Sequence, residues 1–341
     1  MTSSSPLLSV RDLSVTFGMK RESSFTAVDG LSFDVHPGQT VGIVGESGCG
    51  KSVTSLAIMG LLPERGNTVT GTVGYDGQDL LALSRKQMGG KRGKEISMIF
   101  QDPLSSLNPV VPIGRQVTEV LERHQGLSRK AATPRAKEML DKVGIPDPER
   151  RLTDYPHQLS GGMRQRALIA MALACEPRLL IADEPTTALD VTIQAQILAL
   201  LRELVEDTGT ALILITHDLG VVAGLCDEIN VLYGGRLVER AERHELFAQP
   251  RHPYTGGLLA SVPSLEGERG GRLNPIPGSV ADNLPWTGSC AFAPRCANAT
   301  DRCRELAPDL AVESNHRALR CFNPLAGAPS PAEGETREAV R

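Results

Sequence analysis

The chain has 341 residues, a formal net charge of −4 at pH 7 and 4% aromatic residues. This length allows one large α/β domain and a smaller appended one. The slightly negative charge and the few aromatic residues argue against a dedicated nucleic-acid-binding protein, because such proteins usually carry a basic stripe or stacking aromatic side chains. Residues 1–6 lack the features of a secretory signal, and no apolar run approaches ~20 residues, so we expect a soluble, cytoplasmic chain.

Two segments near the N-terminus alternate apolar and polar residues. They are residues 8–17 and 31–35, and their period of two predicts half-buried antiparallel strands. Residues 71–77 are expected to add a strand with a turn, which completes a small antiparallel layer beside a nucleotide. A stacking partner for adenine could come from Phe17 or Phe25, although a core strand residue is an equally good interpretation of either.

A glycine-rich loop follows an apolar run at residues 40–44 and precedes a helix-like stretch at residues 53–62. Its pattern G-x-x-x-x-G-K-S, between a strand and a helix, is typical of a phosphate-binding loop. Backbone N–H groups, the helix start and the Lys51 ammonium would bind phosphates, and the Ser52 hydroxyl would bind magnesium. The residues expected to hold nucleotide here are Gly45, Glu46, Ser47, Gly48, Cys49, Gly50, Lys51, Ser52 and Val53.

The next segments are predicted from their turn residues and periodicity. Residues 86–94 are basic and contain glycine, which favours a solvated surface loop. Residues 102–112 contain three prolines and are expected to form a loop, not a helix. Residues 113–144 have a helical pattern, interrupted at Thr133-Pro134, and are polar enough for a separate helical lobe.

Three apolar, strand-like segments end in residues that can take part in chemistry. The segments are residues 96–100, 179–182 and 211–216. The amide oxygen of Gln101 could bind magnesium or the attacking water. Because successive side chains of a strand point in opposite directions, Asp183 and Glu184 should differ in role: Asp183 fits magnesium and Glu184 fits a general base. His217 could hydrogen-bond a γ-phosphate.

Ser160-Gly161-Gly162 precedes an alanine- and leucine-rich helix. Ser160 stands where an N-cap belongs, and the glycines leave the first N–H donors unobstructed, so this turn is a second candidate for binding an anion. By itself, Ser-Gly-Gly is more often a capped helix start with nothing bound.

These segments, in this order, resemble the ATP-binding cassette (ABC) ATPases. The resemblance rests on the phosphate loop, Gln101, residues 159–166, Asp183-Glu184, residues 187–190 and His217. It implies an α/β P-loop NTPase fold with an antiparallel β subdomain and a helical subdomain at about residues 104–175. It also implies that two such domains meet head to tail, each completing the other's ATP site. The residues that the resemblance adds to that site are Ser160, Gly161, Gly162, Gln165 and Asp190.

A more specific resemblance is to the ATP-binding subunits of the oligopeptide, dipeptide and nickel importers. It rests on residues 42–48, 100–103, 182–192 and 252–255. It implies an ATPase that couples MgATP binding and hydrolysis to uptake of di- or oligopeptides. The implied partners are two membrane-spanning permease subunits, a second, paralogous ATPase subunit and an extracytoplasmic binding protein. The chain would lie on the cytoplasmic side of the cell membrane, with the segment after Gln101 and the helical lobe against the permeases.

Two other functions remain open at this stage. The same ATPase could serve a nickel or other small-solute importer. A soluble cassette protein that acts on nucleic acid or ribosomes is less compatible with the sequence, because such proteins usually carry two cassettes or a long coiled-coil insertion.

Four cysteines lie close together near the end of the sequence, namely Cys290, Cys296, Cys303 and Cys321. In a reducing compartment such a group suggests metal ligation before disulfides. Spacing alone does not separate iron–sulfur from zinc, although structural zinc sites favour tighter pairs. The resemblance to peptide importers implies a [4Fe–4S] cluster. Four unligated thiols are the alternative, and His316 could replace one cysteine.

The predicted organisation has three parts. Residues 1–250 form the nucleotide-binding domain, residues 251–324 a C-terminal extension with the cysteines, and residues 325–341 a disordered tail. A linker or binding loop is expected at residues 275–285.

Overall fold

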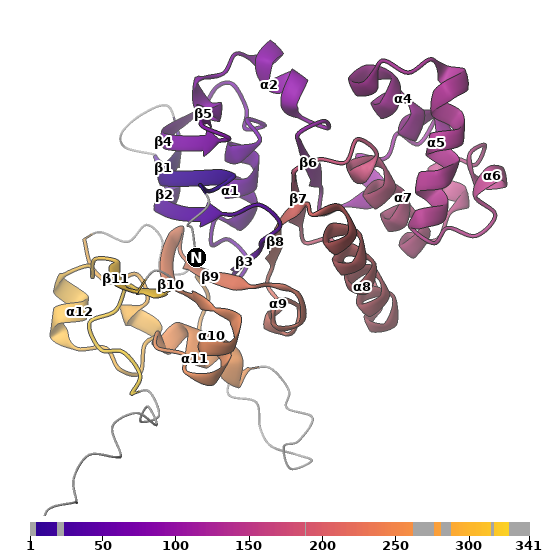
Figure 1. Cartoon of the computed structure of the whole chain (residues 1–341). Helices are drawn as coiled ribbons and strands as arrows, with labels where there is room; N and C mark the ends of the chain where they lie inside the picture. Colours follow the sequence, from indigo (N-terminus) through magenta and orange to yellow (C-terminus); the bar gives the residue numbers. More distant parts are fainter. Residues whose placement is uncertain are drawn as a thin grey trace, which may run out of the picture.

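A computed structural model describes residues 5–18, 24–187, 189–261, 276–280, 288–314 and 317–326. His316, most of the predicted linker at 275–285 and nearly all of the predicted tail lie outside these ranges. Figure 1 shows the described chain as two sheets with a helical lobe on one side and the C-terminal segments on the other.

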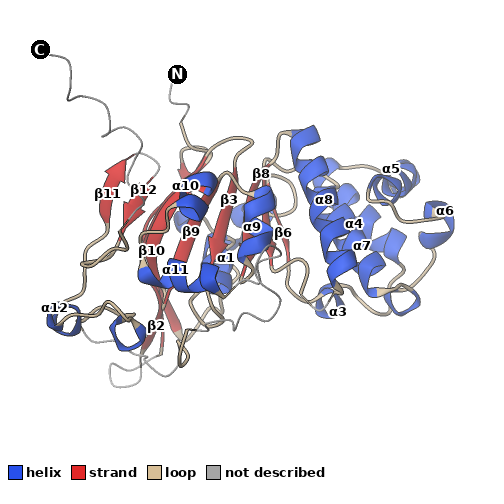
Figure 2. Ribbon diagram, turned by 90° about the horizontal axis from the view of Figure 1, so that it is seen from below, coloured by secondary structure: helices blue, strands red, loops and turns tan. Residues whose placement is uncertain are grey.

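The central element is a sheet of eight strands in the order β11-β12-β10-β9-β3-β8-β7-β6. Strands β9, β3, β8, β7 and β6 are parallel to one another, whereas β10 runs antiparallel to both β9 and β12. Figure 2 shows this sheet from below. The strands are β3 Thr40–Val44, β6 Ile96–Ile99, β7 Leu179–Asp183, β8 Ala211–Thr216, β9 Glu228–Tyr233, β10 Arg236–Glu242, β11 Ala311–Ser314 and β12 Arg317–Leu319.

A second sheet has four strands in the order β2-β1-β4-β5. They are β1 Leu8–Phe17, β2 Phe25–Val35, β4 Asn67–Tyr75 and β5 Gln78–Asp79. The alternation predicted for β1 is confirmed, since Leu8, Val10 and Val15 are buried in one core with Ile43 and Ile213 of the large sheet. Helix α1, Lys51–Ile58, contacts both sheets. The two sheets therefore share a core around the helix that follows the phosphate loop.

The helical lobe is formed by α3 Pro103–Ser106, α4 Ile113–Gln125, α5 Arg129–Lys142, α6 Pro148–Arg151 and α7 Gly161–Leu173. The interruption expected at Thr133-Pro134 is wrong, because Pro134 lies inside α5. The chain breaks earlier, where Gly126 ends α4 with φ of 67° and the Ser128 hydroxyl caps α5 by accepting from the N–H of Ala131. These two cap residues determine where one helix ends and the next begins, and they outweigh the effect of the N–H group that Pro134 lacks.

Two predicted loops also contain helix. Residues 86–94 include most of α2, Arg85–Lys91. This helix starts with a capping box, in which the Ser84 N–H donates to Gln87 Oε1 at 2.9 Å and the Gln87 N–H donates to Ser84 Oγ at 3.4 Å. Residues 102–112 begin with the single turn of α3, whose first residue is Pro103. Proline suits that position because its fixed φ is helical and its missing N–H has no role there.

The remaining helices and short 3₁₀ turns follow the strands. They are η2 Leu80–Ala82, η3 Pro156–Gln158, α8 Val191–Thr208, α9 Leu219–Leu225, α10 Arg243–Ala248, α11 Pro253–Ala260, η5 Ala293–Arg295 and α12 Asp301–Glu305.

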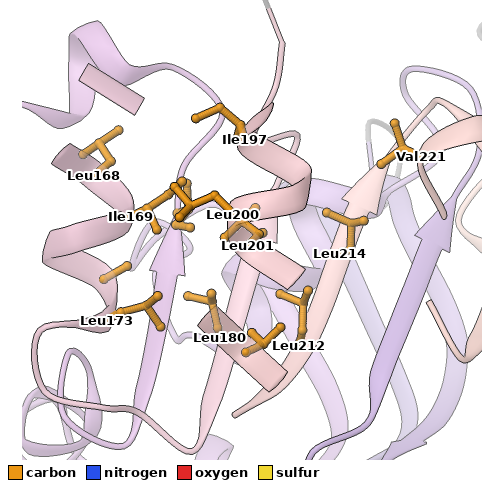
Figure 3. Close-up of a cluster of buried hydrophobic side chains, with 14 of the residues drawn as sticks. Leu168, Ile169, Leu173, Leu180, Ile197, Leu200, Leu201, Leu212, Leu214 and Val221 are labelled. Atoms are coloured by element: carbon orange, nitrogen blue, oxygen red, sulfur yellow. The ribbon is translucent and has the colours of Figure 1, made fainter. Parts of the chain in front are cut away.

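An apolar cluster joins the helical lobe to the large sheet. Figure 3 shows buried side chains of α7 and α8 packed with side chains of β7 and β8. The cluster includes Leu168, Ile169, Leu173, Leu180, Ile197, Leu200, Leu201, Leu212 and Leu214. It fixes the position of α7 relative to the strands that carry the acidic residues.

The region after residue 250 extends the large sheet. Strand β12 pairs with β10 through Glu239↔Leu319 and Arg240↔Ala318. A buried ion pair reinforces this edge, with Arg317 Nη2 3.2 Å from Glu239 Oε1 and the two side chains 5% and 0% exposed. The C-terminal segments are therefore joined to the cassette by backbone pairing and by charge.

Two glycines with left-handed backbones test how tightly the sheets are packed. Gly235 has φ of 78°, and an added Cβ would lie 2.5 Å from the Ala27 carbonyl oxygen. Gly77 has φ of 79° with no atom within 4 Å of an added Cβ. We expect Gly235→Ala to lower stability by about 2–4 kcal/mol and Gly77→Ala by about 1–2 kcal/mol, because only the first adds a clash to backbone strain. Thermal unfolding of both variants measures this, and equal losses would contradict the close packing.

Candidate active site

The phosphate loop joins β3 to α1 and needs its glycines. Gly45, Gly48 and Gly50 have φ of 155°, 83° and 93°. An added Cβ on Gly45 would lie 2.3 Å from the Leu232 carbonyl oxygen, and one on Gly50 would lie 2.4 Å from that of Ala27. A side chain at either position would collide with backbone, so the loop can take this path only with glycine.

Lys51 is the first residue of α1 and is 5% exposed. Its Nζ donates to the carbonyl oxygens of Gly45 at 2.7 Å and Glu46 at 3.0 Å. Cys49 is buried in the core, and burial raises the pKa of its thiol. Cys49 can therefore contribute its backbone to a ligand, but not a reactive thiolate.

An open cavity of about 370 Å³ lies over this loop. Its lining residues come from both sheets, α1 and two strand ends: Phe17, Phe25, Ala27, Ser47, Gly48, Gly50, Lys51, Ser52, Val53, Gln101 and Glu184. Phe17 and Phe25 are paired across β1 and β2. Both aromatic candidates for adenine stacking thus line the cavity.

Asp183 ends β7 directly beside α1. The Ser52 hydroxyl donates to its Oδ1 at 3.0 Å, and the Ser55 hydroxyl donates to its Oδ2 at 3.5 Å. Burial raises the pKa of Asp183, and the charge of Glu184 adds to this shift against the opposing hydrogen bond from Ser52. A buried carboxylate in this environment is stabilised by a cation, and hydroxyl and carboxylate oxygens are ligands that magnesium prefers.

Glu184 follows with a left-handed backbone, φ 47°. Its Oε2 accepts from Thr187 Oγ1 at 2.9 Å and from Gln101 Nε2 at 2.9 Å, and its Oε1 lies 3.3 Å from His217 Nδ1. Burial opposes ionisation, but the hydrogen bonds of Thr187 and His217 outweigh it and lower the pKa of Glu184. The structure thus brings the polar residues at three strand ends around one ionised carboxylate.

The second predicted anion-binding turn lies elsewhere in this chain. Ser160 caps α7, its Oγ accepting from the Met163 N–H at 3.3 Å, and Gly161 is exposed. An added Cβ on Gly162 would lie 2.9 Å from Ile193 Cγ2, so the turn packs against the start of α8. None of these residues lines the cavity over Lys51, and α7 stands apart from α1 in both views (Figures 1 and 2).

Two further predicted nucleotide ligands are also outside the cavity. Asp190 is exposed and caps α8, its Oδ1 accepting from the Ile193 N–H at 3.0 Å. Gln165 is 1% exposed, and its Nε2 has no hydrogen-bond partner among the described residues. Within one chain, Asp190 therefore acts as a helix cap and Gln165 as a core residue.

Sequence reasoning gave no role to three residues that support the site. The Thr187 hydroxyl donates a hydrogen bond to Glu184 Oε2. The Tyr254 hydroxyl accepts from the Glu46 N–H at 2.9 Å, and Arg295 Nη1 donates to Glu46 Oε2 at 2.9 Å. Tyr254 belongs to the importer-like segment at 252–255, and Arg295 directly precedes a cysteine, but neither position indicates a contact with the phosphate loop.

The four C-terminal cysteines are near one another without forming a compact ligand set. The Cys290 N–H donates to the Cys303 carbonyl oxygen at 2.9 Å. Burial raises the pKa of the Cys321 thiol to about 11, and Cys290, Cys296 and Cys303 add to the shift. Within the described ranges, no three His, Cys, Asp or Glu side chains are placed to hold a metal ion. Ligand geometry therefore does not support the predicted iron–sulfur cluster.

None of the described helices combines the length and the apolar character needed to cross a membrane.

Comparisons with known proteins agree with the fold. A family model described as "ABC transporter" matches residues 28–187, and one described as "Oligopeptide/dipeptide transporter, C-terminal region" matches residues 238–303. The dipeptide transport ATP-binding protein DppD of Bacillus subtilis is 52% identical over 93% of this chain and 94% of its own length. DppD of Escherichia coli is 50% identical over 95% and 99%. The oligopeptide transport ATP-binding protein OppD of Salmonella typhimurium is 49% identical over 94% of each.

A solved structure shares the fold. It is a dimeric ATP-binding cassette in a post-hydrolysis state, bound to ADP and Pi, which is 28% identical with a TM-score of 0.62 over 69% of this chain and 98% of its own. The family matches, the extent of these similarities and the phosphate loop lead to one conclusion. The chain belongs to the ABC transporter family, among the ATP-binding subunits of its oligopeptide and dipeptide group.

Proposed function

We propose that this chain is the ATP-hydrolysing subunit of an importer that takes up dipeptides or oligopeptides across the cytoplasmic membrane. The observation that carries the ATPase assignment is the convergence of Lys51, Asp183 and Glu184 on one cavity. The peptide cargo is supported by relatives that match nearly the whole chain and are named as dipeptide or oligopeptide transport proteins. This support favours peptides over nickel, and membrane transport over action on nucleic acid.

Nucleotide binding is assigned to the phosphate loop. The Lys51 ammonium donates hydrogen bonds to two carbonyl oxygens of the loop and can donate to phosphate oxygens instead. The first residues of α1 line the same cavity, where their backbone N–H groups can bind an anion. Ser52, Asp183 and Gln101 offer oxygens to magnesium, which would neutralise charge on the outer phosphates. Ser52 and Asp183 fit this role because their oxygens are 3.0 Å apart.

Hydrolysis is assigned to Glu184 as the general base. Its lowered pKa keeps the carboxylate ionised and able to accept a proton from water. Thr187 and Gln101 fix one carboxylate oxygen, and His217 lies at the other, where it can also reach a terminal phosphate. These three side chains orient the carboxylate of Glu184, which lines the cavity.

The turn Ser160–Gly162 is assigned to the ATP site of a second cassette. Its hydroxyl and N–H donors are at the exposed start of α7, away from this chain's own phosphate loop. Dimerisation of the similar solved cassette supports this arrangement. ATP would join two cassettes, and loss of the terminal phosphate would separate them. A paralogous subunit is the proposed second cassette.

The permease contact is assigned to the segment after Gln101 and the helical lobe. Phe100 and Val110 are large apolar residues that are 39% and 77% exposed on either side of α3. Exposed apolar side chains of this kind suit burial against another subunit. The chain would bind at the cytoplasmic side of the membrane through two permeases, which receive peptide from an extracytoplasmic binding protein.

The iron–sulfur cluster is proposed from donor chemistry alone, because the described side chains do not already form a ligand set. Four thiols within electrostatic range of one another have the donor type for [4Fe–4S] ligation. Bound there, the cluster would link segments on both sides of α12. No step of ATP hydrolysis depends on it.

Glu184→Gln should reduce ATP turnover by about 10²-fold or more while MgATP still binds, because the base is lost and the phosphate loop is intact. Turnover and nucleotide affinity of the purified protein give the result. Glu149→Gln, which changes an exposed carboxylate paired with Lys137, is the matched control. Unchanged turnover in Glu184→Gln would remove Glu184 from this role.

Cargo is tested in proteoliposomes that contain this subunit, its second cassette, the permeases and the binding protein. Dipeptides or oligopeptides should stimulate ATP hydrolysis, whereas nickel salts should not. Stimulation by nickel alone would favour the metal importer, and co-purification with ribosomes without permeases would favour the nucleic-acid function.

Anaerobically purified protein should be brown, with iron, sulfide and broad visible absorbance. Cys296→Ser should lose this absorbance, whereas Cys175→Ser, which changes a thiol outside the C-terminal group, should keep it. A colourless wild-type protein without iron would contradict the cluster and favour four unligated thiols.

A further inference from the structure

The C-terminal extension contacts the phosphate loop through one buried ion pair. Arg295 closes the η5 turn, and its Nη1 lies 2.9 Å from Oε2 of Glu46, the second residue of the G-x-x-x-x-G-K-S loop. The side chain of Arg295 is 4% exposed and that of Glu46 is 26% exposed. The pair joins residues 249 positions apart in the sequence.

Arg295 is held rigidly on the side of the extension. Its Nε donates to the Pro277 carbonyl oxygen at 2.7 Å, and its Nη2 donates to that of Gly278 at 3.0 Å. The guanidinium also lies 5.8 Å from the centre of the Tyr233 ring, within range of a cation–π contact. With its donors fixed in this way, the guanidinium is a preorganised partner for one carboxylate.

Glu46 is fixed by three different groups. Its N–H donates to the Tyr254 hydroxyl at 2.9 Å, its carboxylate accepts from Arg295, and its carbonyl oxygen accepts from Lys51 Nζ at 3.0 Å. Tyr254 packs edge-on against Tyr233, with ring centres 4.8 Å apart. A continuous set of contacts therefore runs from the extension through Glu46 to the lysine that receives phosphate.

Charge makes this contact important for an anionic ligand. Glu46 Oε1 is buried and has no hydrogen-bond partner within the described ranges, so Arg295 is the neutralising group found there for this carboxylate. Without the guanidinium, a poorly hydrated negative charge would remain in the loop that receives triphosphate. That charge would repel the ligand and would also loosen the backbone on which Lys51 rests.

We propose that Arg295 is a positioning residue for nucleotide binding: it neutralises Glu46 and holds the phosphate loop in its binding conformation, so that the affinity for ATP depends on the C-terminal extension. The proposal rests on the proposed function, because it assumes that ATP binds over Lys51. It assigns to the extension a role at the ATP site that does not depend on what the cysteines hold.

The experiment compares two buried arginines of the extension. Arg295→Gln should raise the Kd and KM for MgATP on the order of tenfold, with a smaller change in kcat. Arg317→Gln removes a similarly buried ion pair, to Glu239, and none of the hydrogen bonds or ion pairs of Arg317 in the described ranges is to the phosphate loop. It should lower the melting temperature but leave the Kd of MgATP within about twofold of the wild-type value. Titration calorimetry and steady-state kinetics on the full chain give these quantities.

A second substitution tests the charge itself. In the Arg295→Gln background, Glu46→Gln should recover most of the lost affinity, because the unpaired charge is removed. A purely structural role of Arg295 would predict no recovery. If Arg295→Gln does not fold, Arg295→Lys is the variant to measure. It keeps the positive charge but has fewer hydrogen-bond donors, so we expect its Kd for MgATP to lie between that of the wild-type protein and a value about tenfold higher.

The outcomes separate the two proposals. Wild-type protein that fails to bind MgATP would overturn the proposed function. Wild-type protein that binds, together with an unchanged Kd in Arg295→Gln or Arg295→Lys, would overturn the role of Arg295 alone. An equal loss of affinity in Arg317→Gln would also overturn it, because the effect would then follow from general destabilisation of the extension.

Discussion

The parallel pairing of β3, β8 and β7 is the constraint on which the rest of the structure depends. These strands are almost entirely apolar and buried, and their registers align Val44 with Thr216 and Asp183 with Ile215. Parallel strands in register end at the same edge, so each polar residue that follows a strand arrives at the same place. Ser52 and Asp183, 131 positions apart, are within hydrogen-bond distance for this reason.

The two adjacent acids show how a single strand end can provide two kinds of carboxylate. Burial raises the pKa of Asp183, whereas hydrogen bonds from Thr187 and His217 lower that of Glu184. The left-handed backbone at Glu184 turns the chain sharply after β7, which gives the second acid surroundings different from those of the first. Neighbouring groups with opposite shifts are suited to different tasks, which agrees with the roles that we propose for them in cation binding and proton acceptance.

Sequence patterns predict most of the fold and the centre of the site, because their signals are local. Apolar runs predict the strands, and each run carries its polar residue at a fixed position, as with Gln101 and His217. The failures are of two kinds. The interruption predicted at Thr133-Pro134 and the loop predicted at residues 86–94 are wrong, because cap residues had more influence than proline and local charge. Tyr254 was given no role, because its contact with Glu46 spans 208 positions and exists only once the sheets have packed.

The C-terminal cysteines show a further limit of spacing arguments. The spacing of the four cysteines indicates metal ligation, but neither the spacing nor the thiol chemistry predicts how the four side chains are arranged in the fold. In the structure the Cys290 N–H donates to the Cys303 carbonyl oxygen, so peptide groups join the two ends of this turn. The turn thereby places the arginine that precedes Cys296 against the phosphate loop.

The great separation of Arg295 and Glu46 along the chain has a consequence for biosynthesis. A ribosome completes the phosphate loop early, but the guanidinium that neutralises it is added only after about five-sixths of the polypeptide has been made. A nascent or truncated chain that ends between residues 217 and 295 carries the phosphate loop, Asp183, Glu184 and His217 but lacks this cation. If nucleotide affinity depends on this pair as proposed, full affinity would be reached only when the protein is nearly finished.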